Sequence, residues 1–298
     1  MKNKITSILI FLIFFNLILF NVSNVSSYTQ EETADDSEYV FVTTNTESGE
    51  TSTMGISDSV KDYIEEALES GNEYEEVNPY IPNEYNISTS SIIGTDDRTT
   101  VSSTTYPYSA VGYMVSTFSD GTTLRGTAFL IAPNVALTAG HMVFDETHGT
   151  ASSAVFIPGR DGSTYPYGST EIYQFSSTTD WAYNYDDDYD WAVLILTDNI
   201  GNDTGWVGFR WYHSYSSCVG LDVEITGYPK YYNNGTTVQY QQYAMTGTIT
   251  KATDYRLYYT IDTSGGNSGG PIWEADTYYV IGVHTKRRNF QQQWFEIK

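Results

Sequence analysis

From residue 91 onward the chain is a succession of short β-rich runs, and this feature limits the fold more than any other. Gly, Asn, Asp and Pro separate runs rich in Tyr, Val, Thr and Ile, and no long helical period interrupts them. Strands at this spacing indicate an all-β sandwich or a pair of barrels. The runs are VGYMVSTF, RGTAFLIAP, NVALTAGH, SAVFIPG, DWAVLIL, WVGFRW, DVEITGYP, VQYQQYAMTGTIT, YRLYYTID and YYVIGVHT. Residues 91–298 suit two small barrels side by side, barrel 1 over about 91–200 and barrel 2 over about 201–298.

The first residues have the layout of a secretory signal peptide. Lys2 and Lys4 precede an apolar run from Ile5 to Phe20, and small polar residues follow as far as Ser27. An uncleaved anchor is the alternative, but the run is shorter than the ~20 residues that a spanning helix needs. We therefore expect residues 1–27 to be removed. The product would be secreted and extracellular, with no stable membrane association.

Residues 28–90 are polar and carry 16 acidic residues against a single lysine. Within SDSVKDYIEEALESG, Val60, Ile64 and Leu68 recur every four residues, which predicts one amphipathic helix that ends at Gly71. Such a charged segment does not fold alone. It is either a disordered linker or a propeptide that docks on the domain behind it. We favour the propeptide, because no folded domain precedes it for a linker to connect.

Net charge and cysteine content exclude some classes of partner. The formal charge of −23 argues against nucleic acid and anionic membranes. The one cysteine, Cys218, cannot form an internal disulfide, so stability must come from core burial or bound ions. We interpret Cys218 as a small buried hydrophobe rather than a reactive thiol.

Two polar residues lie at the ends of apolar runs. His141 follows the strand run in NVALTAGH, where small residues flank it, and Asp190 directly precedes the apolar run of DWAVLIL. A carboxylate at the edge of a buried strand needs a partner, and histidine is the partner useful for catalysis. Alternatively, Asp190 is one more solvated acid beside residues 186–188, a run that could equally hold a cation.

The stretch TSGGNSGGPIW, residues 263–273, predicts a rigid loop that presents Ser268. Its glycines allow backbone conformations that other residues resist. The N–H groups of Gly266 and Ser268 could then form an oxyanion hole. A linker is the alternative, but this stretch lies between two apolar strands. In the order His141, Asp190, Ser268 the three residues match the catalytic order of one class of serine hydrolase.

TAGH, DWAVLIL and GNSGGP resemble the trypsin-like, chymotrypsin-fold serine proteases. SSIIGTDDRTTVSSTTYPYSAVGYM, TSGGNSGGP and GVH are more similar to the Bacillus-type glutamyl endopeptidase branch, over about residues 91–285. The resemblance implies two six-stranded antiparallel β-barrels with the catalytic cleft between them. It also implies His141 as general base, Asp190 as its orienting acid and Ser268 as nucleophile.

The same resemblance implies a pocket for acidic side chains. Thr263 and His284 match the residues that bind the substrate carboxylate in that branch, and a hydroxyl with an imidazole N–H can satisfy a carboxylate. Ser91 matches the mature N-terminus, whose α-amino group would help to hold the pocket. Asn267 stands where other trypsin-like enzymes carry an Asp that pairs with that amine, which leaves the amine available for an acidic substrate.

The residues before Ser91 bear on how the zymogen is processed. Ser90 is not acidic, so self-cleavage after glutamate is not the obvious route to Ser91. Glu84 is the nearest upstream glutamate.

The C-terminal stretch KRRNFQQQWFEIK departs from the resemblance, since family members continue with a Gly-rich wall, another strand and a helix. A frameshift or truncation is the favoured interpretation and a natural variant ending the alternative. We predict a secreted serine endopeptidase, made as a zymogen, that cleaves after Glu and less well after Asp. Two alternatives stay open: a catalytically impaired or dead binding protein, and a protease of other specificity.

Partners and cofactors follow from this hypothesis. The partners would be peptide or protein substrates with acidic residues and the chain's own propeptide, on a monomeric enzyme. We expect no cofactor and no catalytic metal, with a structural calcium ion left open.

Overall fold

The structure, a computed structural model, describes residues 40–55, 74–82, 99–212, 214–232, 236–237, 240–285, 287–288, 291–292 and 295–296. The expected signal peptide, the helix expected to end at Gly71 and the expected mature N-terminus at Ser91 lie outside these residues. So does much of the unusual C-terminal stretch.

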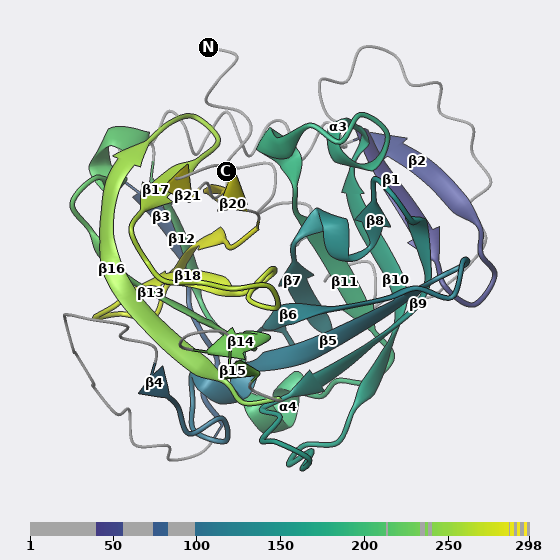
Figure 1. The fold of residues 1–298 in the computed structure, drawn as a ribbon, viewed down its shortest axis with the longest axis horizontal. Coiled ribbons are helices and arrows are strands. Elements are labelled where there is room, and N and C mark those ends of the chain that lie inside the picture. Colours follow the sequence, from purple (N-terminus) through teal and green to yellow (C-terminus); the bar gives the residue numbers. More distant parts are fainter. Residues whose placement is uncertain are drawn as a thin grey trace.

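Residues 111–196 form a closed antiparallel barrel, shown in teal and green in Figure 1. The strand order around it is β5-β6-β7-β11-β10-β9, and β9 pairs back with β5. Its strands are β5 (Val111–Phe118), β6 (Thr123–Ala132), β7 (Val135–Thr138), β9 (Gly149–Pro158), β10 (Thr170–Thr178) and β11 (Ala192–Leu196). This confirms the expected all-β class and a six-stranded barrel in the first half of the domain.

Apolar β-branched and aromatic residues explain why these runs become strands. All five residues of β11 are buried, as expected for the continuous apolar run AVLIL. Gly112 lets β5 and β9 approach closely, because a Cβ atom there would lie 2.3 Å from the ring of Phe156. Phe129, Phe156 and Phe175 are fully buried inside the barrel.

The second half forms a sheet of order β17-β16-β13-β18-β19-β12 beside the first barrel (Figure 1). Its strands are β12 (Phe209–Tyr212), β13 (Asp222–Gly227), β16 (Tyr243–Ala252), β17 (Leu257–Tyr259), β18 (Pro271–Glu274) and β19 (Val280–Val283). It has its own core around Val223, Ile225 and Ile272. Cys218 is 0% exposed in that core, which confirms its interpretation as a buried hydrophobe.

The remaining elements are short. They are β4 (Thr99–Thr100), β8 (Phe144–Asp145), β14 (Tyr231–Tyr232), β15 (Thr236–Thr237), β20 (Arg287–Arg288), β21 (Gln291–Gln292), β22 (Phe295–Glu296), α3 (Thr179–Ala182), α4 (Gly201–Thr204), and 3₁₀ turns at 108–110, 140–142, 187–189 and 215–218. β4 pairs with β16, and β22 pairs with β19.

Part of the acidic segment before residue 91 is built into both β bodies. β1 (Val40–Asn45) pairs with the edge of β10, β2 (Thr51–Gly55) pairs with β1, and β3 (Tyr74–Val77) pairs with β12. We call residues 40–55 and 74–82 the N-terminal strap. β1 and β2 are the purple strands of Figure 1. The sequence predicted docking of this segment but not these strands.

Candidate active site

Antiparallel pairing of β7 with β11 brings His141 and Asp190 together. Ala192, at the start of β11, is opposite Thr138, at the end of β7. The residues just beyond this pair are therefore neighbours: a 3₁₀ turn after β7 carries His141, and Asp190 directly precedes the Trp191 that leads into β11. The sequence predicted this pairing from two separate strand ends.

Asp190 fixes both the backbone and the ring of His141. The backbone N–H of His141 donates to Oδ1 of Asp190 over 2.8 Å, and Nδ1 lies 2.9 Å from Oδ2 and 3.1 Å from Oδ1. The Asp190 side chain is 1% exposed, so burial strengthens this interaction. A carboxylate only accepts hydrogen bonds, so Nδ1 carries a proton and Nε2 is left as the basic nitrogen.

A small residue before His141 makes room for the turn. A Cβ atom at Gly140 would lie 2.4 Å from the ring of Trp181. Trp181 is fully buried, and its Nε1 donates to the carbonyl of Phe144 over 3.1 Å. The rigid indole therefore fixes the backbone that holds His141.

Ser268 lies in a tight loop between β17 and β18. Gly266 and Gly269 have φ of +102° and +85°, conformations that favour glycine. A Cβ atom at Gly266 would lie 2.3 Å from the carbonyl oxygen of Tyr228. Asn267, between them, is 0% exposed. The loop is a rigid turn rather than a linker.

Contacts with β6 and with the residues after β19 hold the loop that carries Ser268. Thr127 on β6 donates its N–H to the carbonyl of Ser268 over 2.8 Å and its hydroxyl to the carbonyl of Gly266 over 2.8 Å. On the other side, Gly269 donates to the carbonyl of His284 over 2.6 Å. The loop of the second sheet is thus attached to the barrel that carries His141.

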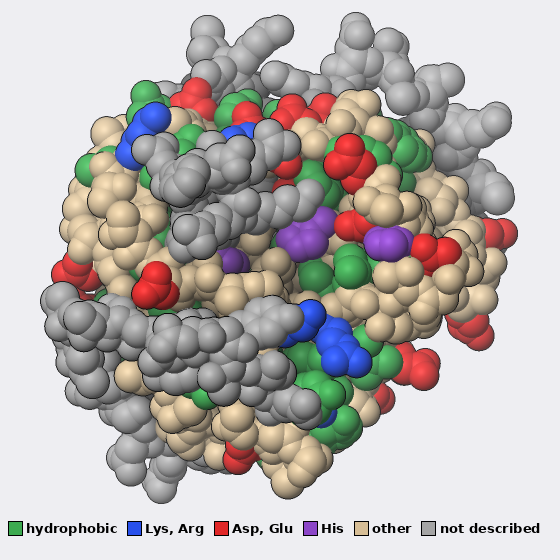
Figure 2. All heavy atoms as spheres, in the orientation of Figure 1, with side chains coloured by type: hydrophobic (Ala, Val, Ile, Leu, Met, Phe, Trp, Pro, Cys, Tyr) green, Lys and Arg blue, Asp and Glu red, His purple; other side chains and the backbone are tan. Residues whose placement is uncertain are grey.

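Ser268 and the turn that carries His141 both lie close to Gly126. A Cβ atom at Gly126 would lie 2.7 Å from the sulfur of Met142 and 2.9 Å from the carbonyl oxygen of Ser268. The hydroxyl of Ser268 donates to the carbonyl of Thr285 over 3.3 Å. Figure 2 shows histidine side chains near the middle of this face, where the two β bodies meet.

The backbone of the loop offers two hydrogen-bond donors. Among the residues that the structure describes, the N–H groups of Gly266 and Ser268 donate to no protein acceptor, whereas that of Asn267 donates to Ser264. An oxyanion hole requires two donors aimed at one point beside a serine hydroxyl, so these two N–H groups are candidates for it.

His284 is a buried neutral imidazole beside this loop. Its side chain is 3% exposed, and its Nδ1 lies 3.0 Å from the hydroxyl of Tyr259. Burial, with a smaller contribution from His141, holds the pKa of His284 well below its usual range. Thr263 is partly exposed, and the described contacts tie His284 to Gly269 and Gly270 rather than to Thr263.

Sequence reasoning missed Tyr259 and a second buried polar group, Glu224. Tyr259 occurs in the run LYYTID, where alternation could have identified it as inward-facing. Glu224 accepts hydrogen bonds from Trp273 and Thr226 at 3.1 Å, and burial raises its pKa to about 7. Its position inside DVEITGYP gave no comparable signal.

The acidic run at 186–188 is used structurally in the described chain. Asp186 accepts from the N–H of Asp188, and Asp188 forms an ion pair with Arg256. In the part of the chain that the structure describes, no group of three or more His, Cys, Asp and Glu residues could hold a metal ion. Over the same residues, no helix is long and apolar enough to cross a membrane.

Comparisons with known proteins identify the family of the chain. The model of the trypsin family matches residues 99–293. A glutamyl endopeptidase of Bacillus licheniformis is 36% identical over 192 residues, which are 64% of this chain and 57% of that protein. A Bacillus subtilis protein named extracellular metalloprotease is 41% identical over 210 residues, 68% of this chain and 65% of that one. The chain thus spans less than two thirds of the length of either relative.

Solved structures show the same fold. A Glu endopeptidase in complex with MPD superposes with a TM-score of 0.59 at 28% identity, covering 70% of this chain and 94% of that one. The protease Anisep from Arthrobacter nicotinovorans superposes with a TM-score of 0.54 at 19% identity, covering 63% and 89%, which shows the fold alone. The chymotrypsin-like fold expected from the sequence is confirmed.

Proposed function

The chain belongs to the trypsin family of serine proteases, and from this premise we propose that it is a secreted endopeptidase that cleaves peptide bonds after Glu. The observation that carries the catalytic part is the buried Asp190 bound to His141 beside a loop with two unengaged N–H groups. The specificity part is supported by buried His284 and by the glutamyl endopeptidase among the relatives.

In the proposed reaction, Nε2 of His141 removes the proton of the Ser268 hydroxyl as its oxygen attacks the scissile carbonyl. Before attack, that hydroxyl turns from the carbonyl of Thr285 toward His141. The carbonyl oxygen becomes an oxyanion that accepts from the N–H groups of Gly266 and Ser268. Asp190 stays ionised and stabilises the imidazolium.

Collapse of this intermediate breaks the C–N bond, and His141 returns its proton to the leaving amine. The product is an acyl-enzyme on Ser268. Water, deprotonated by His141, then attacks the ester, and the proton passes back to Ser268 as the acid product leaves.

Neutral His284 is suited to an acidic side chain. The hydroxyl of Tyr259 lies 3.0 Å from Nδ1 of His284, and donation from this phenol would favour the tautomer with its proton on Nε2, which could donate to a substrate carboxylate. Thr263 would add a second donor. The α-amino group freed at Ser91 would supply the positive charge once the secreted zymogen is cut before this residue.

The test incubates the secreted chain with a mixed peptide library beside a Ser268→Ala variant. Cleavage after Glu that disappears in the variant supports the proposal. Serine-dependent cleavage after other residues would contradict only the proposed specificity for Glu. No cleavage in either sample would favour the binding-protein alternative. Parallel samples with a serine-directed organophosphorus reagent or a chelator distinguish a serine-dependent activity from a metal-dependent one, which the name of the B. subtilis relative would suggest.

A further inference from the structure

We propose that the N-terminal strap stays bound as a non-covalent part of the protein after the chain is cut behind it, and that it fastens the two β bodies together. This role differs from that of an inhibitor that must leave. Only the activity arm of the test below rests on the proposed protease function.

On the first barrel the strap completes a sheet edge. β1 pairs with β10 from Phe41 opposite Thr178 to Asn45 opposite Gln174. Phe41 is 3% exposed and belongs to the barrel core, and its ring lies 6.1 Å from that of Trp191, the residue after Asp190. Thus the strap packs against the segment that holds the catalytic carboxylate.

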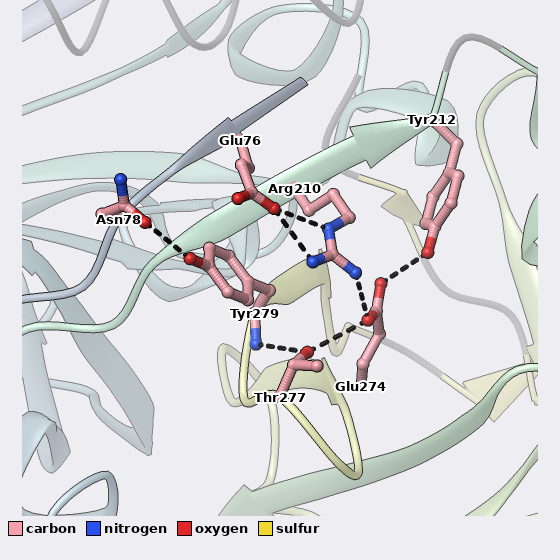
Figure 3. Close-up of polar contacts among 7 residues, drawn as sticks. All are labelled: Glu76, Asn78, Arg210, Tyr212, Glu274, Thr277 and Tyr279. Atoms are coloured by element: carbon pink, nitrogen blue, oxygen red, sulfur yellow. Dashed lines mark hydrogen bonds and ion pairs between the residues drawn. The ribbon is translucent and has the colours of Figure 1, made fainter. Parts of the chain in front are cut away.

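On the second sheet the strap is fastened by strand pairing and by charge. β3 pairs with β12 over four residues, so that Glu76 is opposite Arg210. The guanidinium of Arg210 donates to Glu76 over 2.9 Å and 3.2 Å and to Glu274 over 2.5 Å. Figure 3 shows Arg210 between the two carboxylates. A guanidinium that donates to two carboxylates in a partly buried place is a stronger link than an exposed ion pair.

The residues after β3 continue this interface. The hydroxyl of Tyr279 donates to Oδ1 of Asn78 over 2.8 Å (Figure 3). Tyr80 and Trp206 exchange backbone hydrogen bonds of 3.0 Å and 3.1 Å, and their rings stack with centroids 4.3 Å apart. Paired backbone groups and stacked rings are features of a stable interface.

The segment that leads into β12 is shaped to receive the strap. A Cβ atom at Gly208 would lie 2.6 Å from the carbonyl oxygen of Val77, and one at Gly205, where φ is +78°, would lie 2.6 Å from that of Tyr80. Any larger residue at these two positions would push the strap away. The surface therefore accommodates this segment of the chain by its backbone as well as by its side chains.

The strap does not bond to the catalytic groups themselves. It links the first barrel to the second sheet, the two bodies that carry these groups. Among the described residues, its hydrogen bonds and ion pairs reach none of His141, Asp190 and Ser268. The first two come from the barrel and Ser268 comes from the second sheet, so a segment bound to both bodies limits their relative motion. The distance between Ser268 and His141 sets the geometry of attack.

The experiment inserts a foreign protease site within residues 83–98, in a Ser268→Ala background that prevents self-cleavage. After cutting, we expect the strap fragment to co-elute with the domain in size-exclusion chromatography at micromolar concentration. Its removal by mild denaturant and refolding dilution should lower the Tm of the domain. Prompt loss of the fragment with an unchanged Tm would overturn the proposal.

Two matched pairs of variants test the interface. Phe41→Ala should speed dissociation of the cut fragment at least 10-fold, whereas Met54→Ala, at its exposed cross-strand partner, should not. Glu76→Gln should also speed dissociation, whereas Glu50→Gln, an equal charge change at an exposed turn, should not. If Phe41→Ala does not fold, the comparison of Glu76→Gln with Glu50→Gln still tests the interface. Equal effects within both pairs would contradict the proposed contacts.

The activity arm repeats the cut with Ser268 intact. Activity retained with the fragment bound, and reduced when it is stripped, supports the fastening role. Activity that appears only after the fragment leaves would make the strap an inhibitor and overturn the inference. If no form cleaves peptides, the proposed function fails, while elution and Tm still decide the strap.

Discussion

Asp190 accepts two hydrogen bonds from His141, one from the ring and one from the backbone of the same residue. The ring contact sets the tautomer, and the backbone contact sets the position of the turn. Both follow from the antiparallel pairing of β7 with β11, which ends at Thr138 and Ala192, just before these two residues are reached.

Replacing Asp190 with Asn should lower kcat/KM by about 10⁴-fold with the fold kept, because an amide N–H favours the wrong tautomer of His141. Hydrolysis of a peptide with one Glu measures the effect, and thermal unfolding checks the fold. Asp203→Asn, an equal charge change at an exposed residue, should leave kcat/KM unchanged. A loss below 10-fold at Asp190 would contradict its orienting role.

Local patterns predicted the barrel strands, and they selected the three catalytic candidates. The run VGYMVSTF is β5 itself, and DWAVLIL contains β11 with Asp190 just before it. Both are long apolar runs whose burial is decided by their own composition. The need of a buried carboxylate for a partner suggested the pairing of Asp190 with His141, and the resemblance added the roles of the three candidates.

The strands of the strap could not be read in this way. The run VFVTTN of β1 is short and lies in an acidic segment, and β3 contains two adjacent glutamates. They become strands because β10 and β12 offer edges to pair with, and Arg210 offers a partner for Glu76. Such non-local partners override a weak local preference. Glu224 was missed because its hydrogen-bond donors, Trp273 and Thr226, are set by the fold rather than by the local pattern.

Gly266→Ala should reduce kcat/KM by at least about 10²-fold, the usual effect of losing one oxyanion donor. Its Cβ atom would meet the carbonyl oxygen of Tyr228 at 2.3 Å, so the loop and its N–H must move. Gly265→Ala is the matched control, because a Cβ atom there has no neighbour within 4 Å. Steady-state kinetics of both variants measure the effect. Equal activity of the two would argue against an oxyanion hole at Gly266.

Glu224 should make the protein less stable as the pH rises. Burial raises its folded pKa to about 7, against 4.5 for the ordinary group, so its contribution is fully present below pH 4.5. Between these values the unfolded state releases its proton first, and the free energy of unfolding falls by about 3 kcal/mol in total.

Glu224→Gln should remove this decline, because the amide keeps an acceptor for Trp273 and Thr226 without a charge. Urea unfolding of the Ser268→Ala protein at pH 5 and pH 8 measures the difference. Glu171→Gln, at an exposed position of β10, is the control and should keep the decline. If the free energy of unfolding of Glu224→Gln falls by the same amount between these pH values, groups other than Glu224 cause the decline.

Tyr259→Phe should weaken discrimination between Glu and Gln at the cleavage position. Burial raises the pKa of Tyr259 well above its usual value, so its phenol stays protonated and can donate to Nδ1 of His284. Without that donor the proton of the neutral imidazole moves between Nδ1 and Nε2, and only the Nε2–H form can donate to a carboxylate.

The expected loss is about 5- to 10-fold in the ratio of kcat/KM for two peptides that differ only in Glu or Gln, the worth of one hydrogen bond. Tyr258→Phe removes a hydroxyl from the adjacent, half-buried residue and should leave the ratio unchanged. An equal fall for both peptides in Tyr259→Phe would indicate a merely structural role, because misplacement of the loop does not distinguish a carboxylate from an amide. A fall in kcat/KM that is confined to the Glu peptide would therefore indicate that Tyr259 sets the tautomer of His284.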